Sequence, residues 1–160
     1  GIADPKTLER FREKSKVGEM VKATVGGWLH EISGEPITII GRIEHLGPVE
    51  WIETGPMRRG AEQKIEYIAS LDIGENRHVL ITERLYAPMS ADPLKAMGLD
   101  VDSLDIVELK SRVHHKAYWD TWSAVDYPID PPGLGPADLS TLDYDYLPWG
   151  IYPIGEKWEK

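Results

Sequence analysis

The first apolar positions of the chain recur with helical spacing. Leu8 and Phe11 are three residues apart, and they follow Asp4 and Pro5, which are typical of a helix cap and of a first helical position. The apolar spacing stops before Gly18, a residue that commonly ends helices. We therefore predict a helix that begins after Asp4 and ends before Gly18.

Alternating Val, Ile and Thr dominate the region that follows, which is the pattern of half-buried strands. Turn-forming residues at Ser33-Gly34 and at Gly74-Glu75-Asn76 divide these runs, so that two β-hairpins are expected. Two glycines, Gly26 and Gly27, suggest a bulge or a close backbone approach in the first strand. The predicted strand segments are 20–30, 35–46, 49–55, 64–74 and 77–85.

The pattern changes after residue 90. Residues 92–99 open with Asp-Pro and predict a short helix, residues 102–110 return as a strand, and residues 115–122 fit one or two helical turns. A last extended segment is expected at 124–133. This combination of predicted strands and helices favours an α+β fold, with a mixed β-sheet of about six strands and two or three short helices.

The last part of the chain is rich in proline and aromatic residues. Six of the twelve prolines lie between residues 128 and 153, which argues against regular structure there, while nine of the fourteen aromatic residues lie from Tyr118 onward. We therefore predict an irregular C-terminal wrap in which Trp149 and Tyr152 pack against the sheet. Cutting the chain after Pro136 would then destabilise it by several kcal/mol, since a large buried side chain contributes about 3 to 5 kcal/mol.

Composition narrows the function classes. A length of 160 residues predicts a single domain, and a net charge of −9 makes a nucleic-acid partner unfavourable. The absence of cysteine excludes disulfides, a thiol nucleophile and thiolate metal sites. No apolar run reaches the roughly 20 residues that span a bilayer, and the start has no signal-peptide pattern, so no membrane partner and a cytoplasmic location are expected.

The stretch DIVELKSRVHHKAYWDTW places Lys110, Ser111 and His114 together at a predicted strand-to-helix corner. Ser111 can cap the helix, whose free amides favour an anion, while Lys110 and His114 add a charge and a donor. In the alternative interpretation Ser111 only caps, Lys110 is solvated and His114 packs under the tryptophans. His30, His45 and His78 lack metal-ligand spacing, and the adjacent His114 and His115 point apart on a helix, so no metal site is predicted.

Several stretches together resemble the C-terminal domain of the microcystinase C (MlrC-like) metallopeptidase family. They run from IADPKTLERF through VGEMVKATVGGW, ITIIGRIEHLGP and ITERLYAPMSADPLKAMGLD to DIVELKSRVHHKAYW and YPIDPPGLGPADLSTLDYDYLPWGIYPI. The family pattern is similar to K-S-x-x-H-F-R-A, then a strand ending in D-x-P-G, then a closing Tyr-Pro or Trp-Pro pair. The matching residues are Lys110, Ser111, His114, Pro132, Gly133, Tyr152 and Pro153.

The resemblance implies a parent enzyme roughly three times as long, whose N-terminal domain supplies the zinc ligands and the catalytic water. Residues 1–160 then form a single domain without catalytic residues or a cofactor of its own, which we expect to be a fragment, an excised domain or a separately encoded half. A D-N-P-G-G-G segment of the family is missing. His115 replaces a phenylalanine of the family pattern and Lys116 an arginine.

Two functions of different class follow. In the first, the chain shapes the substrate cleft of a zinc hydrolase acting on peptides or amides, with the N-terminal metallopeptidase domain as its partner, and Lys110, Ser111 and His114 bind substrate. In the second, the chain is a non-catalytic binding or assembly module that retains the fold without the enzyme.

Overall fold

The structure, a computed structural model, describes residues 1–28, 31–111, 113–131, 135–136, 138–139, 142–146 and 150–151. The first helix, α1, spans Pro5–Lys14, as its pattern predicts. The Asp4 carboxylate caps it by accepting a hydrogen bond from the Thr7 amide, and Leu8 and Phe11 are buried on its inner face. The local sequence was sufficient to predict this helix, because the capping residue and the apolar face indicate the same helical segment.

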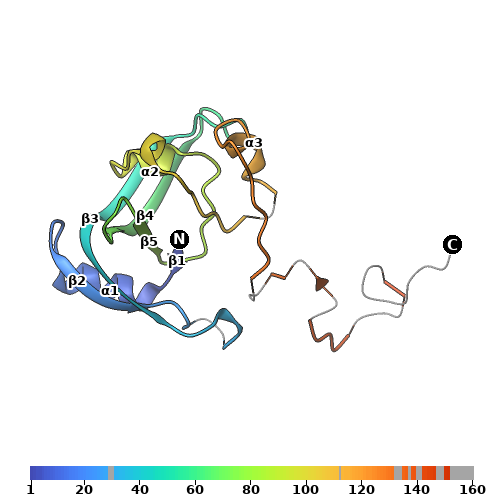
Figure 1. Ribbon diagram of the computed structural model, residues 1–160, viewed down its shortest axis with the longest axis horizontal. Coiled ribbons are helices and arrows are strands. Elements are labelled where there is room, and N and C mark those ends of the chain that lie inside the picture. The colour runs from blue at the N-terminus through green and yellow to red at the C-terminus, as the bar shows by residue number, and fades with distance from the viewer. Residues whose placement is uncertain are drawn as a thin grey trace.

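Among the described residues, five strands form one mixed sheet in the order β1-β5-β4-β3-β2 (Figure 1). They are β1 (Ile2–Ala3), β2 (Met20–Val25), β3 (Ile37–Ile52), β4 (Glu62–Asp72) and β5 (His78–Thr82). The strands from β2 to β5 pair antiparallel with their neighbours, while β1 joins β5 in parallel. Both predicted hairpins are confirmed, and the segment predicted at 49–55 is the end of the long β3.

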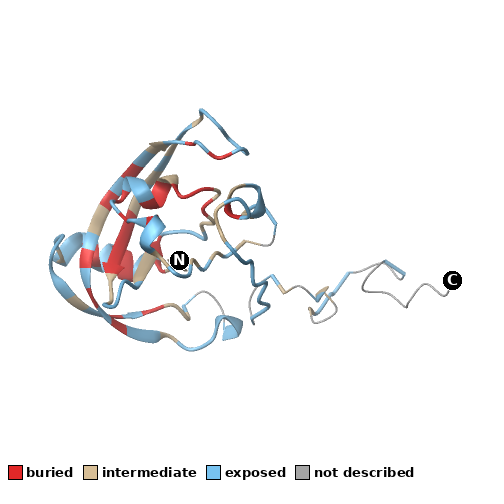
Figure 2. Cartoon of the chain, turned by 45° about the horizontal axis from the view of Figure 1, so that its top comes forward, coloured by how far each residue is buried: buried red, intermediate tan, exposed pale blue. Residues whose placement is uncertain are grey.

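Buried side chains form two apolar clusters on opposite faces of the sheet. The first packs α1 against the sheet, and the second packs α2 (Asp92–Ala96) and the aromatic residues of α3 (Lys116–Trp119). Consecutive β4 residues Ile68 and Ala69 belong to different clusters, as strand geometry requires. Because both faces of the sheet are covered, β4 is buried continuously at Ile68–Leu71 (Figure 2).

Short 3₁₀ turns and glycines connect these elements. Two 3₁₀ turns connect helices and strands within the described part of the chain, η1 (Glu31–Ser33) and η2 (Val101–Ser103). Gly98, with a φ of 88°, closes α2. Gly27 follows β2 with a φ of 71°, and a Cβ there would lie 2.7 Å from Pro36, so the expected close backbone approach is confirmed just after the strand.

The prediction of a strand at 102–110 is wrong. Residues 101–103 form η2, and residues 104–110 make no strand pairing in the described part of the chain. Val107 and Leu109 are half-buried against the second cluster while Ile106 is 85% exposed, so the side chains alternate as in a strand. An alternating pattern specifies which side chains are buried but not whether the backbone finds a partner.

The described residues after Trp119 contain no further α-helix or strand, so the predicted irregular C-terminal segment is confirmed for them. The extended segment expected at 124–133 forms no strand where it is described. Burial of aromatic residues does not extend to Tyr127 and Tyr146, which are 80% and 97% exposed. The predicted burial of Trp149 and Tyr152 lies outside the described residues. Within the described ranges no helix is long and apolar enough to cross a membrane.

Candidate functional site

A hollow of about 390 Å³ lies between β5 and the segment 104–110. Its inner wall is apolar and belongs to the second cluster, with Leu80, Leu94, Leu104 and Val107 among its residues. Charged and polar side chains, among them Lys110, surround its opening. The volume and the mixture of an apolar wall with a few polar groups are typical of small ligand sites.

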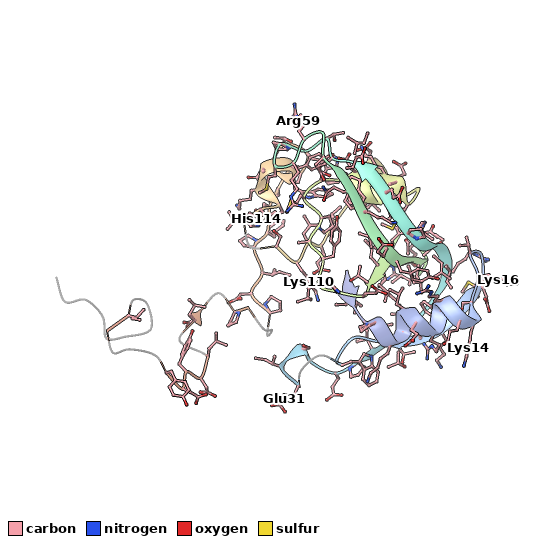
Figure 3. All side chains as sticks on the ribbon, turned by 180° about the vertical axis from the view of Figure 1, so that it is seen from behind. Lys14, Lys16, Glu31, Arg59, Lys110 and His114 are labelled. Carbon is pink, nitrogen blue, oxygen red and sulfur yellow. The ribbon has the colours of Figure 1, made fainter. Side chains whose placement is uncertain are left out.

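Lys110, Ser111 and His114 lie on the stretch that leads into α3. Lys110 is exposed and borders the hollow near β1, whereas His114 is exposed beside α3 (Figure 3). The Ser111 hydroxyl accepts a hydrogen bond of 3.2 Å from the His115 amide, so it fixes the turn before α3. No hydrogen bond links the three side chains to one another within the described residues, and their role in substrate binding stays a prediction.

The alternative packing of His114 under the tryptophans is wrong, because its neighbour His115 is the half-buried one. The His115 Nε2 lies 3.4 Å from the Asp126 carboxylate, and Lys116 Nζ lies 3.1 Å from the same group. The Lys116 hydrogen bond lowers the pKa of Asp126 against a smaller opposing effect of burial, and Asp126 in turn raises the pKa of Lys116. The two departures from the family pattern, His115 and Lys116, therefore share one partner.

Two carboxylates, Glu53 and Asp92, lie at the corner where β3 ends and α2 begins. The Glu53 side chain is buried, and it accepts hydrogen bonds from the Gly55 amide at 2.9 Å and from the Trp51 indole at 3.2 Å. Asp92 accepts from the Thr54 amide at 2.6 Å and from the Thr54 and Ser90 hydroxyls. A buried carboxylate with donors on both oxygens is satisfied, so this corner is held rigidly.

The electrostatics of this corner shift two pKa values. Burial raises the pKa of Asp92, but hydrogen bonds donated by the Thr54 amide, the Thr54 hydroxyl and the Ser90 hydroxyl outweigh it and leave the pKa below its ordinary value. Burial raises the pKa of Tyr86, and the nearby charges of Glu53 and Asp92 raise it further. Tyr86 also lines the hollow and packs edge-to-face on Trp51, so it connects the acidic corner with the hollow.

Sequence reasoning missed Glu53, although a signal was present. Val49, Trp51 and Glu53 alternate on one face of the predicted strand, which places a carboxylate at an inward position. Asp92 was interpreted only as the start of a helix. The donors to Glu53 lie two residues away on either side, but Thr54, which donates to Asp92, is distant in the chain, and pattern analysis does not reveal such a pair.

The described residues contain no group of three or more His, Asp or Glu side chains arranged to hold a metal ion. His45 Nε2 lies 3.4 Å from the Gly47 carbonyl oxygen, and His78 Nδ1 lies 2.8 Å from Glu44. Both histidines therefore have a hydrogen-bonding partner within the fold. His30 lies outside the described residues.

Comparisons with known proteins agree with this fold. The family model described as MlrC C-terminus matches residues 1–145. A solved structure from Mesorhizobium sp. BNC1, named "putative metallopeptidase", superposes with a TM-score of 0.52 at 22% sequence identity, over 60% of this chain and 19% of that one. The likeness shows a shared fold, and the chain spans about a fifth of that protein's length. No curated protein gives a match.

Proposed function

Since the chain belongs to the MlrC C-terminus family, we propose that it shapes the substrate cleft of a metallopeptidase-like amide hydrolase, in which another domain holds the metal. The family match over residues 1–145 carries this proposal. Zinc on that other domain would act as Lewis acid and activate water. This chain would bind and orient the peptide or amide substrate, and it would supply no catalytic residue of its own.

An exposed apolar stretch supports a partner domain. Five large apolar side chains are exposed to solvent on either side of α3, close in sequence to Lys110 and His114. They are Ile106, Val113, Val125, Tyr127 and Ile129. We propose that the metal-binding domain covers this stretch, which would bring Lys110 and His114 to the edge of the shared cleft.

Lys110 and His114 suit substrate binding because both are exposed and neither is needed to hold the fold. A lysine ammonium attracts a substrate carboxylate or carbonyl oxygen, and an imidazole donates or accepts a hydrogen bond. Ser111 would act as a positioning residue, since its hydroxyl is engaged with the His115 amide and fixes the turn between the other two.

The test measures turnover and melting temperature in the parent protein that contains both domains. Lys110→Ala and His114→Ala should lower amide hydrolysis at least about tenfold, while melting temperatures change little because exposed side chains contribute less than about 0.5 kcal/mol. Lys22→Ala, an exposed lysine on the far edge strand β2, is the matched control.

Turnover of Lys110→Ala and His114→Ala equal to that of Lys22→Ala would refute the assignment of these residues. A metal-loaded parent that binds peptides without hydrolysing any amide would instead favour the non-catalytic binding module. Reading metal content, binding and turnover on the same preparations separates these outcomes.

A further inference from the structure

The His78 side chain is held at both of its ring nitrogens at the start of β5. Nδ1 lies 2.8 Å from the Glu44 carboxylate, and Nε2 lies 3.3 Å from the side-chain oxygen of Asn76. Glu44 belongs to β3, and Asn76 belongs to the tight turn between β4 and β5, where its φ is 55°. The His78 side chain is 16% exposed, so water has little access to replace either partner. Two side chains from different elements therefore orient the imidazole.

The Asn76 side-chain amide can be oriented in one way only. Its Nδ2 lies 2.9 Å from the Ser103 carbonyl oxygen, which accepts hydrogen bonds and cannot donate them. Nδ2 also lies 3.4 Å from the Ser103 hydroxyl, whose own proton is donated to the Asp100 carbonyl at 2.8 Å. Exchanging the nitrogen and oxygen of the Asn76 amide would place two acceptors face to face at Ser103. The Asn76 oxygen therefore faces the imidazole.

These partners require a proton on each ring nitrogen of His78. Both the Glu44 carboxylate and the Asn76 oxygen are acceptors, so Nδ1 and Nε2 must both donate. The Glu44 carboxylate also accepts from the buried Ser70 hydroxyl at 3.4 Å. A neutral imidazole carries one ring proton, and it can satisfy only one of its two neighbours. The arrangement is therefore that of the charged imidazolium.

Two acidic side chains flank the imidazole within the sheet. Glu44 approaches it from β3, and Asp72 lies opposite His78 in the β4–β5 register. Side chains that are opposite each other in register share one face of the sheet. Arg42 continues this row on β3, but its guanidinium donates to the Gly18 carbonyl at 2.8 Å. The sheet therefore favours the positive form of the imidazole.

The charged groups of the turn, of η2 and of the facing segment balance one another. Arg77 and Glu75 lie 3.0 Å apart in the turn. Lys95 of α2 lies 3.9 Å from Asp102 of η2. The charged groups of segment 104–110 and of the residue before β1 that line the same hollow as His78 are Asp105, Lys110, Glu108 and the Gly1 amine. Because these charges cancel, the acids of the sheet decide the electrostatic preference.

We propose that His78 forms a pH-dependent link between the β4–β5 turn and η2. While both ring nitrogens carry protons, the imidazolium holds Asn76, and Asn76 holds Ser103. A typical imidazole loses one of its two protons at about pH 6.5. The Nδ1 proton stays in the short bond to the Glu44 carboxylate, so Nε2 loses its proton and presents a lone pair to the Asn76 oxygen. The link is therefore present at low pH and is lost as the pH rises.

Loss of this link loosens the start of segment 104–110. The turn η2 ends at Ser103, and Leu104 follows it and packs against the second cluster. Asn76 can offer its nitrogen to the deprotonated Nε2 only by giving up the Ser103 carbonyl. Deprotonation of His78 therefore costs one of the two contacts whichever way Asn76 turns. The inference concerns the fold and does not depend on the proposed role in amide hydrolysis.

Nuclear magnetic resonance of the 160-residue chain tests the link, because Asn76 is its single asparagine. Isotopically labelled asparagine then gives one pair of side-chain amide signals. Between about pH 5 and 8, Nε2 of His78 should lose its proton while Nδ1 keeps it, and the Asn76 signals should shift with the same midpoint. The Leu104 amide, which donates to the Val101 carbonyl, should lose at least about tenfold of its protection against hydrogen exchange over this range.

Two variants serve as matched controls. His78→Gln does not titrate, so the Asn76 signals and the Leu104 protection should no longer depend on pH in this range. His45→Gln removes a half-buried histidine of β3 outside the link and should leave the response of Asn76 unchanged. The titration of the unmodified chain decides by itself if either variant fails to fold.

Four results would overturn the proposal. They are Asn76 signals that do not follow the titration of His78, a response of Asn76 that persists in His78→Gln, loss of the proton from Nδ1 instead of Nε2, and an imidazole that keeps one charge state across the whole range.

Discussion

Replacing Asp4 by alanine should strongly destabilise the fold, because one buried carboxylate joins three separate parts of the chain. Its Oδ1 accepts from the Thr7 amide at 3.0 Å and caps α1. Its Oδ2 accepts from the Gly26 amide at 3.2 Å and from the Trp28 indole at 3.0 Å, which ties α1 to the end of β2. Asp4 itself is 0% exposed, so water cannot replace it without a local opening.

The magnitude follows from these three bonds. Loss of a helix cap costs about 1 kcal/mol, and each donor left without its acceptor costs about 1 kcal/mol or more. The expected loss for Asp4→Ala is therefore about 3 kcal/mol, which corresponds to a fall in melting temperature of roughly 6 to 12 °C for a domain of this size. Asp4→Ser keeps the cap but cannot reach all donors, so it should recover about 1 kcal/mol of that loss.

Urea denaturation followed by tryptophan fluorescence measures both variants. Glu13→Ala, which removes an exposed acid from the same helix, is the control and should change stability by less than about 0.5 kcal/mol. A loss below about 1 kcal/mol for Asp4→Ala, or equal stability of the alanine and serine variants, would refute the reasoning from the three bonds.

Three further outcomes are expected. Because the pKa of Asp92 is lowered in the folded state, its carboxylate stabilises the fold fully above the ordinary pKa of 3.8, and this contribution is lost as the pH falls through the lowered pKa. The loss of stability in acid should therefore be shallower in Asp92→Asn. Identical acid titrations of the two proteins would contradict this. Trp119→Ala should cost about 3 to 5 kcal/mol in urea denaturation, because the buried indole packs in the second cluster and donates to the Pro88 carbonyl. Lys116→Ala should leave the urea midpoint close to that of the Glu13→Ala control despite its bond to Asp126, because the pair is exposed to solvent. A clearly lower midpoint would contradict this expectation.

The elements that sequence could predict are those in which local and tertiary preferences agree. Asp4, Leu8 and Phe11 specify α1 through a cap and one apolar face, and the turn at Gly74 specifies the β4–β5 hairpin. Segment 104–110 shows where sequence-based prediction fails. Its side chains do alternate between buried and exposed, but whether it forms a strand depends on a partner strand that is far away in the chain.

The candidate site could be predicted less well than the fold. Residue types identified Lys110 and His114 as polar groups close to each other in sequence, and Ser111 as a hydroxyl that binds a free amide. They did not reveal the hollow, because it depends on which segments meet in space. The burial of Glu53 was indicated by its alternation with Val49 and Trp51, but this signal was not used.

The exposed apolar side chains near α3 are best explained by a neighbouring folded surface. Ile106 and Tyr127 are 85% and 80% exposed, and they lie on either side of α3 along the chain. A single extended peptide covers little area, so a folded surface of some breadth is needed to bury such a stretch. The metal-binding domain proposed above would supply that surface, and by covering the stretch it would bring Lys110 and His114 to the edge of the shared cleft.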